Sequence, residues 1–129
     1  MADSYKVAVA SASGVSVDSH YGKSRSFFVY SVDDDEGYDF LERRTVSQLC
    51  MDGSHIKSAM DERAGLFSDC RYIVASRFGD CAVSSLASVG ITPMELPGSI
   101  DDAILGVWKY NRIQTLFNPV KSQEQEIPV

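Results

Sequence analysis

The chain has 129 residues, enough for one domain with a buried core, and its 44% hydrophobic and 23% charged residues are ordinary for a globular protein. Acidic residues outnumber basic ones by 18 to 12, so the net charge of −6 excludes a nucleic-acid-binding protein with a broad basic face. No run approaches the roughly 18 consecutive apolar residues of a membrane span, and we expect none.

The first expected element is a short central strand over residues 6–10. Val7 to Ala10 are small or β-branched and apolar on both faces, which is typical of a strand buried between two layers. Residues 11–26 hold six serines and two glycines, a composition too polar for a core, in a segment too short for a linker between domains. This segment is therefore predicted to be a loop of functional interest.

A β-hairpin is expected next. Residues 26–32 and 38–44 contain aromatic and β-branched residues, and residues 33–37 between them have the composition of a turn. The acidic run 33–36 in this turn carries four negative charges, which leaves only −2 for the rest of the chain. We expect a solvated turn, since the spaced oxygen ligands and the distal glutamate of a calcium loop are missing.

The remainder of the chain alternates between helices and strands. Helices are expected over residues 54–68 and 81–88 and from 99 onward, and strands over 71–75 and 91–96. Ser99 is placed to cap the last helix, and Gly90 to end the second one in a left-handed conformation. This order predicts a single α/β domain, a mostly parallel sheet with helices on its faces. The domain is expected to span residues 1–117, followed by a flexible tail over 118–129.

Two loops are expected to leave the carboxyl ends of strands, where ligands of α/β sheets gather. His20 lies in the first loop, with Lys23 and Arg25 close behind it. Arg77 lies in the second loop, just after the strand over 71–75. An imidazole displayed among cations is a candidate ligand for a metal or a metal cluster. An ordinary surface histidine among solvated loop charges is the alternative.

A histidine–aromatic–glycine motif, His20-Tyr21-Gly22, follows the small-residue first strand and precedes an aromatic strand that starts near Phe27. In this order and spacing the pieces resemble the dinitrogenase iron-molybdenum cofactor biosynthesis family. The resemblance covers about residues 6–110. Tyr21 stands where the family usually has phenylalanine, and Ser76-Arg77-Phe78 stand where many relatives have a glycine-rich strand end.

The resemblance implies both a fold and a function. The fold would be ribonuclease H-like, a mixed five-stranded sheet flanked by helices. The function would be that of a non-catalytic carrier for an iron-sulfur or iron-molybdenum cluster, or its precursor, during nitrogenase cofactor assembly, with cluster-donating and cluster-receiving assembly proteins as partners. His20 is the implied metal ligand, joined by Cys50 as a thiolate. The cations expected around the anionic cluster are Lys23, Arg25 and Arg77.

The three cysteines fit no paired zinc pattern and no closed set of disulfides. Together with a polar N-terminus that lacks a signal-peptide core, they favour the cytoplasm. Cys50 precedes a predicted helix, and whether His55 or Cys81 joins it stays open. Cys81 is either a thiol activated at a helix N-terminus or a small buried residue. Cys70 adjoins a buried strand and is expected in the core.

No enzymatic activity is expected. A nuclease of the ribonuclease H type needs a carboxylate on the first strand, and residues 6–10 contain none. The glycine spacing of a phosphate-binding loop and the Gly-x-Ser-x-Gly motif of hydrolases are also missing from the sequence. The alternative to a cluster carrier is a protein-interaction or regulatory module of the same fold that has lost the cluster and acts through the acidic hairpin.

Overall fold

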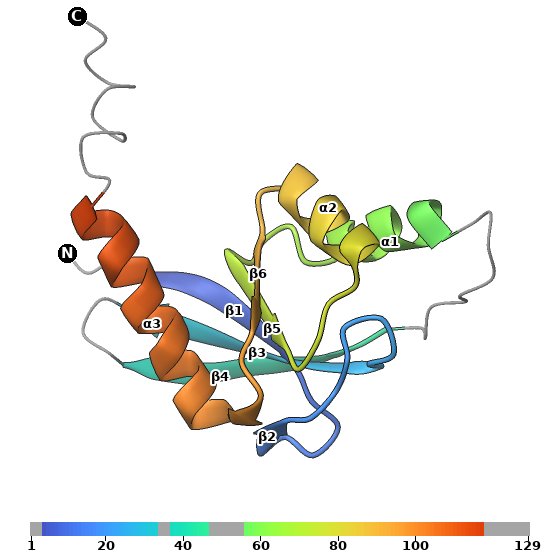
Figure 1. Ribbon diagram of the computed structural model, residues 1–129. Helices are drawn as coiled ribbons and strands as arrows, with labels where there is room; N and C mark the ends of the chain where they lie inside the picture. Colours follow the sequence, from blue (N-terminus) through green and yellow to red (C-terminus); the bar gives the residue numbers. More distant parts are fainter. Residues whose placement is uncertain (1–3, 34–36, 47–55, 118–129) are drawn as a thin grey trace, which may run out of the picture.

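A computed structural model describes residues 4–33, 37–46 and 56–117 (Figure 1). The elements are β1 (Ser4–Ala10), β2 (Ser16–Val17), β3 (Ser26–Asp33), β4 (Tyr38–Thr45), α1 (Ile56–Gly65), β5 (Tyr72–Ala75), α2 (Asp80–Ser88), β6 (Thr92–Glu95), β7 (Gly98–Ser99) and α3 (Ile100–Phe117). No helix within these described ranges is both long and apolar enough to cross a membrane. The expected tail over 118–129 and most of the acidic run 33–36 lie outside the described residues.

Five strands form the central sheet in the order β4-β3-β1-β5-β6. β1 pairs antiparallel with β3, and β3 with β4, whereas β1, β5 and β6 are parallel to one another. The sheet is therefore mixed and five-stranded, as the family resemblance implies, and the prediction of a mostly parallel sheet from the element order is wrong. Among the described residues no helix lies between β1 and β4, whereas the parallel strands β5 and β6 each follow a helix, α1 and α2.

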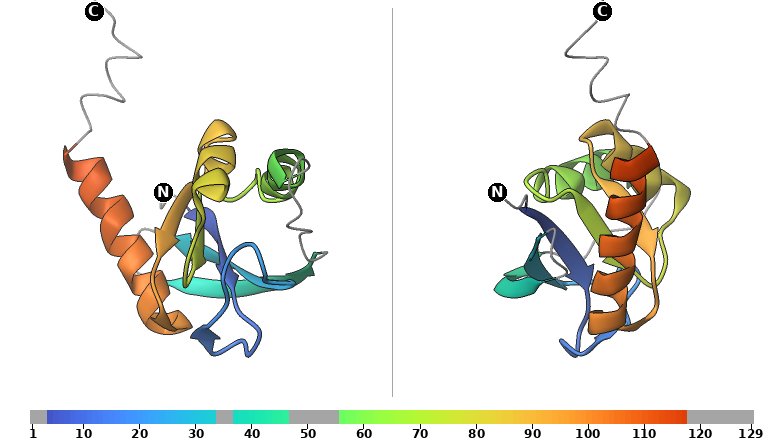
Figure 2. Two further views of the ribbon diagram at one scale, coloured as in Figure 1. Left: turned by 45° about the vertical axis from the view of Figure 1, so that its right-hand side comes forward. Right: turned by 90° about the vertical axis from the view of Figure 1, so that its left-hand side faces the viewer.

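Helices cover both faces of this sheet (Figure 2). α1 and α2 pack on the face that carries Ala8 and Ala10, and α3 packs on the face that carries Val7 and Val9. All four of these β1 residues have no exposed surface. β1 is thus buried on both sides, as its sequence predicts for a central strand.

A second, two-stranded sheet joins the loop after β1 to the start of α3. β2 and β7 pair antiparallel, with Ser16 opposite Ser99 and Val17 opposite Gly98. The sequence predicts only a loop and a turn here, because strands of two residues have no detectable periodicity. Ser99 caps α3 as predicted, since its hydroxyl oxygen accepts a hydrogen bond from the amide of Asp102 at 3.1 Å.

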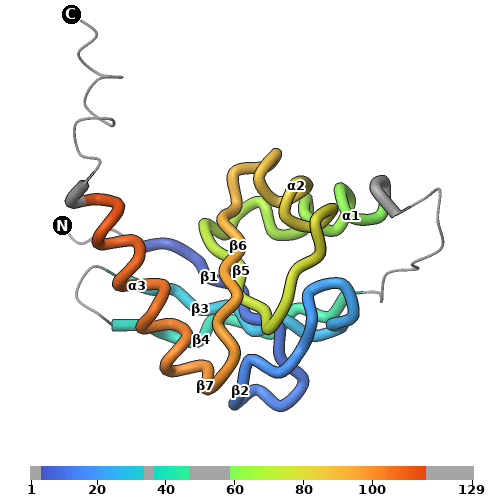
Figure 3. The backbone as a smooth tube through the Cα atoms, in the orientation of Figure 1, coloured from blue at the N-terminus to red at the C-terminus, as the bar shows by residue number. Residues whose placement is uncertain are grey.

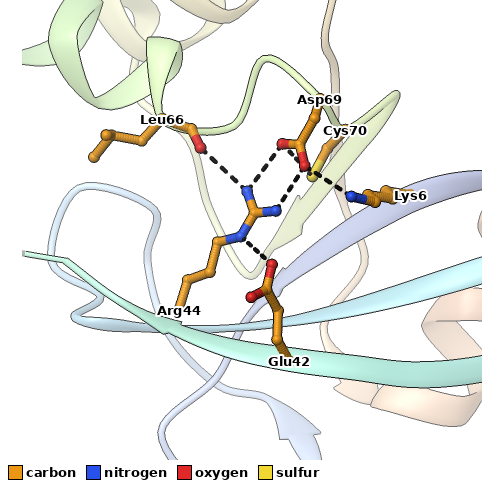
Figure 4. A network of polar contacts seen from close by, with 6 residues as sticks. All are labelled: Lys6, Glu42, Arg44, Leu66, Asp69 and Cys70. Carbon is orange, nitrogen blue, oxygen red and sulfur yellow. Dashed lines mark hydrogen bonds and ion pairs between the residues drawn. The ribbon is translucent and has the colours of Figure 1, made fainter.

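A charged network fastens β4 to the turn between α1 and β5 (Figure 4). Arg44 donates to both carboxylate oxygens of Asp69, at 2.9 and 2.7 Å, and to the carbonyl of Leu66 at 3.1 Å. Lys6 reaches Asp69 at 3.1 Å, and Glu42 accepts from Arg44 at 2.8 Å. The hydrogen bonds from Arg44 hold the pKa of Asp69 well below its usual value, and those to Asp69 raise the pKa of Arg44.

Candidate functional site

The candidate site is built on a tight turn that begins at His20. The carbonyl of His20 accepts hydrogen bonds from the amides of Lys23 at 3.1 Å and Ser24 at 3.0 Å. The buried hydroxyl of Ser24 donates to the carbonyl of Ser26 at 2.7 Å, which fastens the turn to the start of β3. Both His20 and Lys23 are exposed, so an ordered turn presents their side chains to solvent.

Side-chain hydrogen bonds also order the chain that leads to this turn. Asp18 accepts from the amide of Ala12 at 2.9 Å and from the hydroxyl of Ser19 at 3.1 Å. The bond from Ala12 is the main reason that the pKa of Asp18 lies below its ordinary value. Gly14 adopts a φ of +80° beside the ring of Phe28, where a side chain would be strained and crowded. The serine- and glycine-rich composition therefore reflects an ordered loop.

Two loops meet at the carboxyl ends of the parallel strands β1 and β5. His20 and Arg77 form a parallel bridge, and the amide of Tyr21 donates to the carbonyl of Arg77 at 3.0 Å. The amide of Ser76 donates to the carbonyl of Ser19, also at 3.0 Å. Figure 3 shows the blue loop after β1 beside the yellow-green chain between β5 and α2. The structure thus brings together two residues predicted for the site, while their role in binding a ligand stays a prediction.

The aromatic residue of the motif points inward and anchors the turn. Tyr21 has no exposed surface and packs against Phe27 and Phe78, with ring centroids 5.9 and 5.4 Å away. Its hydroxyl has no hydrogen-bond partner among the residues that the structure describes. Burial raises the pKa of Tyr21 to about 12. Tyr21 therefore packs in the core, while its neighbour His20 stays exposed.

Beneath the turn, α1 contributes a buried arginine that was not predicted as a site residue. Arg63 is 2% exposed, and its guanidinium donates to the carbonyl of Tyr21. It also lies over the rings of Tyr21 and Phe27, 5.5 and 5.6 Å from their centroids. Burial lowers the pKa of Arg63. The sequence contains a signal for this burial. Met60 and Ala64 belong to the apolar stripe of the predicted helix, and Arg63 lies three residues after Met60 and next to Ala64.

The profile of the family described as dinitrogenase iron-molybdenum cofactor matches residues 3–110, well over half of the chain and all of the turn just described. The chain belongs to this family. Its assignment agrees with the resemblance seen in the His20-Tyr21-Gly22 motif and in the strands around it.

Relatives within the dinitrogenase iron-molybdenum cofactor family include longer proteins. FeMo cofactor biosynthesis protein NifB of Chlorobaculum tepidum is 30% identical over 111 residues, which cover 86% of this chain and 26% of NifB. Protein NifX of Azotobacter vinelandii is 32% identical over 91 residues, which cover 70% of this chain and 56% of NifX. The chain thus spans about a quarter of that NifB and little more than half of that NifX.

The fold is also found among solved structures. A crystal structure from Methanocaldococcus jannaschii, described as that of a candidate dinitrogenase, superposes with a TM-score of 0.54 at 13% identity. The match covers 83% of this chain and 90% of that one. This likeness concerns the fold alone, a mixed sheet with helices in a single α/β domain.

Of the other residues considered for the site, the structure describes Arg25 but not Cys50 or His55. Arg25 is exposed, and its carbonyl accepts a hydrogen bond from the amide of Val46 at 2.8 Å. Cys50 and His55 lie outside the described residues. The assignment of Cys50 as a ligand therefore stays a prediction, and whether His55 joins it stays open.

The two described cysteines differ in their surroundings. Cys70 is buried as predicted, and burial raises the pKa of its thiol to about 12, which disfavours the thiolate needed for metal binding. Cys81 is exposed at the second residue of α2, so the alternative of a small buried residue is wrong. Within residues 4–33, 37–46 and 56–117, no three histidine, cysteine, aspartate or glutamate side chains are grouped to hold a metal ion.

Proposed function

We propose that this chain is a non-catalytic carrier that binds an iron-sulfur or iron-molybdenum cluster, or its precursor, during nitrogenase cofactor assembly. Membership of the dinitrogenase iron-molybdenum cofactor family supports a role in cofactor assembly, as do relatives named for FeMo cofactor biosynthesis. Proteins that donate the cluster to this chain and receive it from this chain are its proposed partners.

The pairing of His20 with Arg77 is the observation that carries the proposal. It fixes an exposed histidine next to an exposed arginine at the sheet edge where α/β proteins bind ligands. Imidazole is an acceptable ligand for iron, and a metal-sulfur core with organic carboxylates is anionic, so neighbouring cations stabilise it. Lys23 and Arg25 belong to the same loop and add positive charge locally to a protein whose net charge is −6.

A small number of protein ligands suits transfer of the cluster. Four thiolates would hold a cluster permanently, whereas one or two ligands let a recipient protein compete for it. His20 is the proposed ligand on the described turn, and Cys50 is the proposed thiolate. The cluster is therefore treated as cargo rather than as a resident cofactor.

Two further proposals concern the type of fold and the cellular compartment. The strand order β4-β3-β1-β5-β6, with one hairpin and two helical crossovers, supports a ribonuclease H-like arrangement. The cysteine pattern supports a reducing compartment, and the cytoplasm is the location that we propose.

Anaerobic cluster uptake by the full chain tests the carrier function. The protein is mixed with an iron-sulfur cluster assembled from ferrous iron and sulfide, and separately with isolated iron-molybdenum cofactor, and bound metal and visible absorbance are measured. We expect uptake by the wild-type chain and at least about tenfold weaker binding by His20→Ala. His20→Cys should keep most of the affinity, because it replaces the imidazole with a thiolate. Lys109→Ala, which changes an exposed cation on α3, is the matched control.

Two results would contradict the proposal. Binding by His20→Ala at wild-type affinity would exclude His20 as a ligand. Failure of the wild-type chain to take up either cluster would exclude the carrier function and leave the interaction module. The thiolate assignment is tested separately, since we expect Cys50→Ser to weaken uptake. Cys81→Ser shows whether the exposed thiol of Cys81 joins the site.

A further inference from the structure

Arg63 lies beneath the turn that presents His20, although it belongs to α1, far away in the sequence. We propose that Arg63 is a positioning residue for His20, because it holds the backbone carbonyl of Tyr21 and thereby fixes the turn from below. The effect of Arg63 on ligand binding rests on the proposed function, which makes the cluster the ligand of this turn. The contact between α1 and the turn does not depend on it.

Hydrogen bonds to backbone groups define where His20 sits. Its own carbonyl accepts hydrogen bonds from the amides of Lys23 and Ser24. The amide of Tyr21 donates to the carbonyl of Arg77. The carbonyl of Tyr21 accepts from the guanidinium of Arg63. The peptide groups on both sides of Tyr21 are therefore held, one by the loop after β5 and one by α1.

Packing alone does not explain why a charged residue occupies position 63. A guanidinium that is only 2% exposed is costly to desolvate, and an apolar side chain of similar volume would fill the same space at lower cost. An apolar side chain could not donate a hydrogen bond to the buried carbonyl of Tyr21. The rings of Tyr21 and Phe27 stabilise the cation in this place through cation–π contacts.

A second contact links the same helix to the same turn. Met60 precedes Arg63 by three residues, and its Cε lies 3.7 Å from the position that a Cβ on Gly22 would occupy. α1 therefore meets the turn at residues 21 and 22, directly after His20. On this proposal a displacement of α1 would move the imidazole, and Arg63 provides the hydrogen bond between the helix and the binding turn.

The first readout is amide hydrogen exchange of the full chain without any cluster. In Arg63→Met, which keeps a long side chain but cannot donate, we expect the amides of Tyr21, Lys23 and Ser24 to exchange at least about tenfold faster than in wild type. Amides of the central strands β1 and β5 should keep wild-type protection. Arg63→Lys keeps a charge and a donor, and it should restore part of the protection of the turn.

The second readout is affinity for the cluster assembled from ferrous iron and sulfide. Residues that orient a metal ligand typically change metal affinity by about 10- to 100-fold when replaced, and we expect a loss in this range for Arg63→Met. Arg112→Met is the matched control for both readouts. Arg112 also lies over a ring, 5.5 Å from the centroid of Trp108, but it is exposed on α3.

Three outcomes decide the inference. Unchanged exchange of the turn in Arg63→Met, or equal loosening of the turn and of the central strands, would overturn the positioning role. If Arg63→Met does not fold, Arg63→Lys is measured instead. Faster exchange confined to the turn is then the expected result, and unchanged exchange of the turn in Arg63→Lys would overturn the positioning role. If the turn loosens but the wild-type chain takes up no cluster, the proposed function fails and the positioning role of Arg63 stands.

Discussion

Arg44 and Asp69 are joined by two hydrogen bonds, 2.9 and 2.7 Å long, that connect the edge strand β4 to the turn before β5. The chain that continues from Arg44 reaches Val46, whose amide donates to the carbonyl of Arg25 in the loop of the candidate site. This ion pair therefore stabilises the strand that borders the loop.

Asp69→Asn is expected to lower the free energy of unfolding by about 1 kcal/mol at pH 7, a modest value because solvent screens the partly exposed carboxylate. The pKa of Asp69 is lowered in the folded protein, chiefly by Arg44. Its stabilising contribution is therefore complete above the unfolded-state pKa of about 4 and is lost as the pH falls below that value. Urea midpoints of the wild-type and Asp69→Asn proteins should converge below about pH 4, and a difference that grew on acidification would contradict this account.

Tyr21→Phe removes the buried hydroxyl, which has no hydrogen-bond partner among the described residues. An unpaired buried hydroxyl costs about 1 kcal/mol or more, so the variant should be as stable as wild type or more stable by about 1 kcal/mol. The carbonyl that Arg63 holds is unchanged, and cluster uptake should stay at the wild-type level. Chemical denaturation checks the first expectation, and a loss of more than about 1 kcal/mol would show that the hydroxyl has a role that the structure does not reveal.

Much of the fold follows from local patterns in the sequence. The apolar run from Val7 to Ala10 predicts a strand buried on both faces, and Ser99 predicts the start of α3; both are confirmed. The prediction of a mostly parallel sheet failed, because the chain reaches β3 and β4 before the first described helix and these two strands therefore pair antiparallel. The pairing of β2 with β7 could not be predicted, since two residues carry no periodic signal.

The site was predictable only in part. His20 and Arg77 are 57 positions apart in the numbering, and the rule that loops gather at the carboxyl ends of parallel strands is enough to expect them at one edge. Arg63 was not predicted, because a charged residue on a predicted helix is normally assigned to the solvated face. Its helical spacing from Met60 and Phe67 indicates the buried face. A hydrogen-bond acceptor that helps to make this burial tolerable, the carbonyl of Tyr21, comes from a distant part of the sequence.

Gly14→Ala tests whether the order of the loop after β1 depends on its glycine. Gly14 and Gly90 share a φ of +80°, but a Cβ at residue 14 would lie 3.0 Å from Cζ of Phe28, whereas a Cβ at residue 90 would meet nothing within 4 Å. Gly90→Ala should therefore cost about 1 kcal/mol for the backbone alone. Gly14→Ala should cost about 2 to 3 kcal/mol, because the ring must also move. Equal losses in urea denaturation would show that Phe28 adjusts freely.

Arg77→Gln and Lys23→Gln separate the electrostatic attraction of these cations for the cluster from coordination of the metal by His20. Each variant should weaken uptake of the cluster assembled from ferrous iron and sulfide by about three- to tenfold at low salt, because each removes one cation beside an anionic ligand. The losses should shrink toward zero near 1 M salt, where screening acts over about 3 Å, whereas the loss in His20→Ala should persist because coordination is not screened. Lys109→Gln on α3 is the charge-matched control and should bind as wild type at every salt concentration. Losses in Arg77→Gln that were independent of salt would assign Arg77 a direct contact with the cluster or a structural role in the bridge to His20, and would exclude a purely electrostatic one.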